Sequence, residues 1–106
     1  MRIRMLIVFV IVIAVVMGAC SAAPAAQPSA QGDAAKGQAA WAQLSCQGCH
    51  GANAEGASGP KLAGTSKSYG QILNQVRKGE GPMPPFTAAQ VSDQQVMDVV
   101  AWLKSK

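Results

Sequence analysis

The chain is poor in the residues that usually bind metal ions, because its 106 residues include one histidine, His50, and three cysteines. A structural zinc site usually takes four Cys, His or carboxylate ligands, often as two separated pairs. Cys46 and Cys49 lie close to His50, whereas Cys20 lies in an apolar N-terminal segment. This distribution argues against a structural zinc site. Of the functions that the sequence allows, a zinc-binding or redox-thiol module is the least supported.

The sequence also lacks any long segment in which apolar and polar residues alternate, so it predicts no β-sheet and an all-α fold. It contains no internal repeat. Without strands, the cysteine pair lacks the βαβ context of a thioredoxin-like thiol site. Two of the nine Lys and Arg residues, Arg2 and Arg4, lie at the N-terminus, so the rest of the chain is only weakly basic. Nothing in the sequence indicates nucleic-acid binding.

The segment from Cys46 to His50 reads Cys-Gln-Gly-Cys-His, the pattern of covalent c-type haem attachment. Each thiol can add to one haem vinyl group, and the adjoining imidazole can bind the iron axially. A plain disulfide between Cys46 and Cys49 is an alternative, but it gives no reason for the histidine. The motif therefore predicts one covalently bound haem c and an electron-transfer role.

Residues 1–20 predict an export leader. Arg2 and Arg4 precede an unbroken apolar run over residues 5–19, which is too short for an ordinary membrane span and suits the h-region of a secretory signal. The run ends in Met17-Gly18-Ala19-Cys20, which resembles a bacterial lipobox with Met in place of the usual Leu, Val or Ile. We expect Cys20 to be lipidated after cleavage. Cleavage beyond Ser21 and an uncleaved anchor are the alternatives.

Residues 21–32 contain only Ser, Ala, Pro, Gln and Gly. Such a segment buries too little apolar surface to offset its ordering entropy, so it predicts a flexible tether. A linker of this length spans about 20 Å as a coil. The domain that follows would then stand off the membrane while remaining attached to it.

Residues 33–106 predict one domain with three main helices. The first begins near Asp33, a good N-cap, and runs towards Ser45. Gly37 within it suggests close packing against another helix, although a tolerated surface glycine is an alternative. The second helix covers about Tyr69 to Lys78 and ends at Gly79.

The last helix has the clearest start. Ser92 with Gln95 forms a capping box, and Val91 with Val96 could form a hydrophobic staple. Apolar residues then follow at helical spacing, at Val99, Val100 and Leu103. A domain this short has a thin core, and a large covalently bound haem would complete it.

Taken together, these motifs resemble a small class I monohaem cytochrome c over essentially the whole of residues 33–106. The resemblance implies the small cytochrome c fold, with three main helices around one covalent haem. In that family a glycine and an aromatic residue of the first helix cross an aromatic residue of the last. Gly37, Trp41 and Trp102 match these roles.

The family's Gly-Pro-x-Leu segment, which follows the haem motif, is matched by Gly59 to Leu62. The resemblance implies cofactor-binding roles for Pro60 and Leu62. In particular, the Pro60 carbonyl would accept a hydrogen bond from the His50 ring and fix its orientation, which also raises ligand basicity. Pro60 as a simple turn former is the alternative.

Met83 lies in a loop with prolines on both sides, which restrict the backbone around a flexible thioether. The family's axial methionine occurs in such a loop, so the resemblance implies Met83 as the second axial ligand beside His50. Taken alone, a loop methionine is more often core filler. Met97 lies in the last helix among residues that predict packing.

The sequence thus predicts a single-electron carrier, not an enzyme, with His/Met ligation in an extracytoplasmic respiratory or photosynthetic electron-transport chain. We expect it to be tethered at the extracytoplasmic face of a bacterial membrane and to meet redox protein partners. The nearest alternative is the cytochrome subunit of a larger membrane or periplasmic oxidoreductase. A haem enzyme or gas sensor with an open iron is the next, and Met83 argues against it.

Charged residues around the predicted haem site give weaker information. A group of four cations could steer docking onto acidic partners, although a solvated polar face is equally compatible: Lys61, Lys67, Arg77 and Lys78. Tyr69 or Arg77 could also contact a haem propionate, and the sequence does not decide between these two residues.

Overall fold

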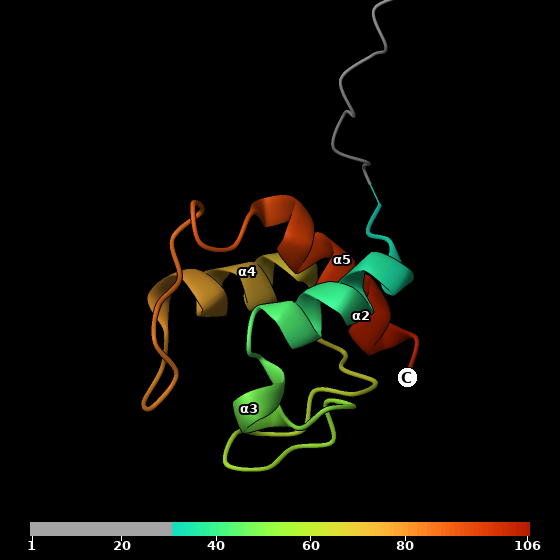
Figure 1. Ribbon diagram of the computed structural model, residues 1–106. Coiled ribbons are helices and arrows are strands. Elements are labelled where there is room, and N and C mark those ends of the chain that lie inside the picture. Colours follow the sequence, from blue (N-terminus) through green and yellow to red (C-terminus); the bar gives the residue numbers. More distant parts are fainter. Residues whose placement is uncertain (1–30) are drawn as a thin grey trace, which may run out of the picture.

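The computed structural model describes residues 31–106, and within that range the protein is all-α (Figure 1). The helices are α2 (Ala34–Gln43), α3 (Gln47–His50), α4 (Tyr69–Lys78) and α5 (Asp93–Lys104). The leader, with Cys20, and nearly all of the linker lie outside the described residues, so their boundaries stay predictions. In the part described, no helix is long and apolar enough to cross a membrane.

The three main helices begin where local capping chemistry predicts. The Asp33 carboxylate accepts hydrogen bonds from the first backbone amides of α2. Ser92 and Gln95 form the expected capping box at the start of α5. A second capping box, formed by Ser68 and Gln71, starts α4; the Ser-x-x-Gln spacing could have revealed it. The short helix α3 was not anticipated.

Helices α2 and α5 cross each other (Figure 1), and Gly37 lies at their point of contact. A Cβ atom at this position would lie 2.0 Å from the Asp98 carbonyl oxygen and 2.9 Å from Trp102 Cβ. Only a glycine permits this approach of the two backbones, so the close-packing interpretation of Gly37 is correct and the surface-glycine alternative is wrong. Beside the crossing, the rings of Trp41 and Trp102 lie 5.3 Å apart between centroids.

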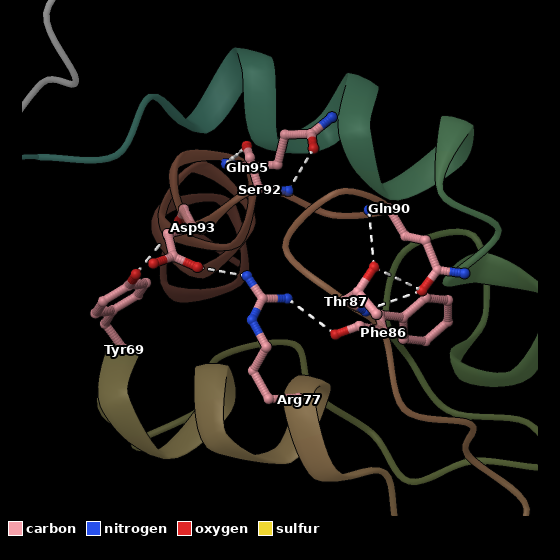
Figure 2. A network of polar contacts seen from close by, with 8 residues as sticks. All are labelled: Tyr69, Arg77, Phe86, Thr87, Gln90, Ser92, Asp93 and Gln95. Carbon is pink, nitrogen blue, oxygen red and sulfur yellow. Dashed lines mark hydrogen bonds and ion pairs between the residues drawn. The ribbon is translucent and has the colours of Figure 1, made fainter.

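α5 is the central helix of the domain, since it packs against both α2 and α4 and lies between them in Figure 2. Burying apolar surface is the main favourable term in folding, and most of the buried apolar side chains belong to α5 or to the elements that flank it. Val91 and Val96, the predicted staple, are both buried. The other members of this core are Ala40, Trp41, Ala54, Ile72, Val99, Val100, Trp102 and Leu103.

One carboxylate is buried beside this core. Asp98 of α5 is 6% exposed. Its Oδ1 accepts one hydrogen bond from the Asp33 backbone amide, at 2.9 Å, and one from Gln94 Nε2, also at 2.9 Å. Asp98 therefore holds the start of α2 on α5, a role that its charge alone did not reveal.

Candidate functional site

The two cysteines of the haem motif lie on a single helical turn. The chain leaves α2 at Leu44 and reverses at Ser45, a non-glycine residue in the left-handed region with φ +62°. The Cys46 carbonyl then accepts hydrogen bonds from the Cys49 and His50 amides, which closes α3. Residues three apart share one face of a helix. The turn therefore presents both thiols together, next to the imidazole.

Both thiols are free rather than joined in a disulfide. Cys49 is exposed and Cys46 is half-buried. Burial raises the pKa of the Cys46 thiol, and a hydrogen bond between the thiol and the Cys46 backbone lowers this pKa to a smaller extent. The pair is thus accessible from one side and packed against the core on the other.

The His50 ring is held in a defined orientation from its Nδ1 side. Nδ1 lies 2.8 Å from the Pro60 carbonyl oxygen. Because a carbonyl oxygen can only accept, Nδ1 carries the proton, and the lone pair of Nε2 is available to a metal. This is the hydrogen bond that the resemblance implied, so Pro60 does more here than form a turn.

Gly59, the residue before Pro60, lies too close to the His50 ring to carry a side chain. A Cβ atom there would lie 2.9 Å from both Nδ1 and Cε1 of His50. The Gly59 amide also donates to the Cys49 carbonyl at 2.7 Å. The backbone of this loop therefore runs directly against the imidazole, at a distance that excludes any other side chain.

Trp41 connects the haem motif to the crossing of α2 and α5. Its indole Nε1 donates to the Gly51 carbonyl at 2.9 Å, and its ring centroid lies 5.9 Å from that of His50. Sequence reasoning assigned Trp41 to helix packing alone. In the structure it also supports the backbone just after His50.

Leu62 is half-buried and packs against the core. The loop that carries it is hydrogen-bonded to Ala54, whose carbonyl accepts from the Leu62 and Ala63 amides. Ala54 is fully buried and has a left-handed backbone conformation, with φ +57°. Nothing in the sequence singled out Ala54, because a left-handed alanine has no local signature.

Met83 lies on a tight turn after α4. Its amide and carbonyl pair with those of Glu80, at 3.0 and 3.1 Å, across Gly81 and Pro82. Met83 is only half-buried, as is Met97 of α5. In Figure 1 the loop from Gly79 to Val91 (orange) and α3 (green) lie to the left of and below the crossing of α2 and α5.

Tyr69 and Arg77 both reach towards the start of α5 (Figure 2). Arg77 forms an ion pair with Asp93 and donates to the Phe86 carbonyl at 3.1 Å, and the Tyr69 hydroxyl lies 3.4 Å from the Asp93 carbonyl oxygen. Burial and, to a lesser extent, the Asp93 charge raise the pKa of the Tyr69 phenol, with a smaller lowering by Arg77. Of the four cations considered for docking, Arg77 is thus engaged, whereas Lys61, Lys67 and Lys78 are exposed.

These residues fit a c-type haem in the chemistry of their donors. Two free thiols adjoin an imidazole whose Nε2 is available, which is the donor set that covalent haem requires. Within residues 31–106, no three His, Cys, Asp or Glu side chains are grouped so that they could hold a metal ion alone. Several apolar side chains pack against the core but stay only partly buried, and a large apolar cofactor could cover them: Leu62, Leu73, Val76 and Phe86.

Comparison with known proteins agrees with this site. Residues 32–103 match the family model described as cytochrome c oxidase, cbb3-type, subunit III. The chain belongs to the cytochrome c family. The cytochrome is 39% identical over 77 residues to a protein named cytochrome c-553-like from Synechocystis sp., covering 70% of each chain. It is 36% identical over 66 residues to cytochrome c-551 of Bacillus subtilis, covering 60% of this chain and 56% of that one. No solved structure gives a match.

The class I cytochrome c resemblance and the all-α fold are therefore confirmed. The protein is an electron-transfer protein rather than an enzyme, and its family implies haem c as cofactor. Cytochromes c work by exchanging electrons with redox partners.

Proposed function

We propose that this cytochrome carries single electrons by means of one haem held covalently by Cys46 and Cys49, with His50 and Met83 as axial ligands. The observation that carries the proposal is the His50 ring, whose Nδ1 lies 2.8 Å from the Pro60 carbonyl oxygen and whose Nε2 is left available beside two free thiols. When bound, the haem supplies an iron ion that gains or loses one electron between its ferric and ferrous states.

The protein's contribution is to hold the ligands and exclude water. The Pro60 carbonyl accepts a hydrogen bond from His50 Nδ1, which fixes the orientation of the ring and raises the basicity of Nε2 as a ligand. Met83, on its paired turn, would supply a soft thioether that raises the reduction potential and closes the iron to other ligands. Leu62 would cover part of the haem face from the loop after His50.

We further propose that the protein works on the extracytoplasmic face of a bacterial membrane, in a respiratory or photosynthetic electron-transport chain. The leader and the Cys20 motif support export and lipidation, and the uncharged linker supports a tether. The partners would be redox proteins, which exchange electrons with one exposed haem edge. The exposed cations Lys61, Lys67 and Lys78 would favour acidic partners.

A second candidate is a cytochrome subunit docked permanently in a larger oxidoreductase. The description of the matching family model, which names a subunit of a cytochrome c oxidase, favours it. Size-exclusion chromatography of detergent extracts from the native membrane distinguishes a free carrier from a subunit of a complex. A free carrier elutes alone, whereas a subunit co-elutes with its complex.

The central experiment is spectroscopy of holoprotein from a host that matures c-type haem. Haem should stay with the polypeptide after denaturation and extraction with acidic acetone, and the oxidised protein should show the weak far-red band of methionine bound to ferric iron. Met83→Ala should abolish that band, lower the reduction potential and allow carbon monoxide or cyanide to bind. Met97→Leu is the matched control and should change none of these. Complete extraction of haem from the wild type, or loss of the band only in Met97→Leu, would contradict the assignment.

A further inference from the structure

The loop that carries Met83 is attached to the rest of the domain at Phe86. The Phe86 amide donates to the Val76 carbonyl of α4 at 2.8 Å, and the Phe86 carbonyl accepts from Arg77 Nη1 at 3.1 Å. The pairing of Met83 with Glu80 is local to the turn. The position of the turn relative to the helices therefore depends on Gly79, where α4 ends, and on Phe86.

Arg77 is the side chain that joins this attachment to α5. Its second terminal nitrogen forms an ion pair with Asp93, the first residue of α5 (Figure 2). The Arg77 side chain is 24% exposed, compared with 62% for Asp93. A guanidinium can donate from two nitrogens in a fixed fork. Arg77 thus connects α4, the Met83 loop and α5 through one rigid group.

We propose that Arg77, oriented by Asp93, is a positioning residue that holds the Met83 loop and so keeps the methionine at the haem iron. The proposal rests on the proposed role of Met83 as axial ligand. Charge-assisted hydrogen bonds are roughly twice as strong as neutral ones. Without Arg77, the end of the loop would keep the Phe86–Val76 hydrogen bond and the packing of Phe86 against the core, but it would lose its charge-assisted bond. The thioether would then be displaced more easily by an external ligand.

The competing interpretation is that Arg77 serves the haem directly, through a propionate. The two interpretations differ at Asp93. If Arg77 acts through the loop, removing the Asp93 charge should loosen the loop as removing Arg77 does. If Arg77 contacts the haem, the Asp93 variant should bind external ligands as the wild type does.

The test is imidazole titration of the oxidised holoprotein, followed by loss of the far-red band. Arg77→Gln should lower the imidazole concentration needed by about tenfold, since hydrogen bonds to charged groups are the stronger class. Asp93→Asn should lower it in the same direction, and the double variant should add little to Arg77→Gln because both act on one contact. Lys78→Gln, which removes an exposed cation one residue away, should match the wild type.

Three outcomes would overturn the proposal. Arg77→Gln could titrate like the wild type, or Asp93→Asn could do so while Arg77→Gln does not. The shift could also recur in Gly37→Ala, which destabilises the domain at the crossing of α2 and α5 without changing the Met83 loop, so that the shift would reflect general destabilisation. Asp93 is mostly exposed, so its variant should fold even if Arg77→Gln does not. If Met83→Ala retains the far-red band, the axial ligand itself is wrongly assigned; if Met83→Ala loses the band, a failure concerns Arg77 alone.

Discussion

At the scale of single residues, the crossing of α2 and α5 depends on one missing methyl group. At Gly37 a Cβ atom would lie 2.0 Å from a backbone oxygen of α5, a contact that no rotamer change relieves. Gly70, in α4, is a contrasting position, because the nearest atom to its Cβ would be Ser68 Oγ at 4.0 Å. The two helical glycines should therefore respond in opposite ways to the same substitution.

Gly37→Ala should lower the free energy of unfolding by about 1–3 kcal/mol, because the added methyl group overpacks the crossing. Gly70→Ala should be neutral or raise it by up to about 1 kcal/mol, through helix propensity alone. Guanidinium titration of the holoproteins, followed by far-ultraviolet circular dichroism, measures both. Equal effects at the two glycines would mean that the helices do not approach at Gly37 as described.

At the scale of the elements, α2 and α5 are held together by an aromatic pair and by one buried carboxylate. Trp41 and Trp102 pack against each other, and Asp98 holds the first turn of α2 through the Asp33 amide. Trp41 also donates to the backbone after His50. The crossing therefore supports the haem motif as well as the core.

Trp102→Ala should lower the free energy of unfolding of the holoprotein by about 3–5 kcal/mol, because it removes a large aromatic that is 4% exposed. The Lys106 ammonium lies 4.7 Å from the centre of the same ring, but it is exposed, so Lys106→Ala should cost at most about 1 kcal/mol. The same denaturant titration compares them. A Trp102 variant as stable as the Lys106 control would contradict the packing described.

At the scale of the whole molecule, the domain is small enough that its stability should depend on the haem. Several apolar side chains that pack against the core are only partly buried, among them Leu62 and Phe86, and a bound haem would cover them. The proposed tether is a separate matter, because residues 21–32 separate Cys20 from the domain. Attachment to a membrane and binding of haem should therefore vary independently.

If Cys20 is lipidated, the mature wild type should begin at that residue, partition into detergent and carry an acylated N-terminus by mass spectrometry. The diacylglycerol that a lipobox implies meets the need for two chains in stable anchoring. Cys20→Ala should release a soluble cytochrome or leave the leader attached, with the haem spectrum unchanged in either case. A soluble wild-type protein that begins beyond Cys20 would refute lipidation.

The sequence by itself determined what depends on neighbouring residues. The Cys46–His50 motif, the caps at Asp33 and Ser92 and the end of α4 at Gly79 are all local, since each involves residues within about one helical turn. The short helix α3 and the Ser68 capping box were local too, and closer attention to spacing would have found the box.

Only the tertiary structure decided contacts between residues far apart in the chain. Asp98 meets Asp33 across 65 positions, and Arg77 meets Asp93 across 16. Each carries a charge that, in sequence, fits a solvated surface equally well. Which partner such a charge finds depends on the helix crossing, and the crossing is fixed by packing rather than by any local signal. For the same reason the sequence did not reveal that Arg77 pairs with Asp93 at the start of α5.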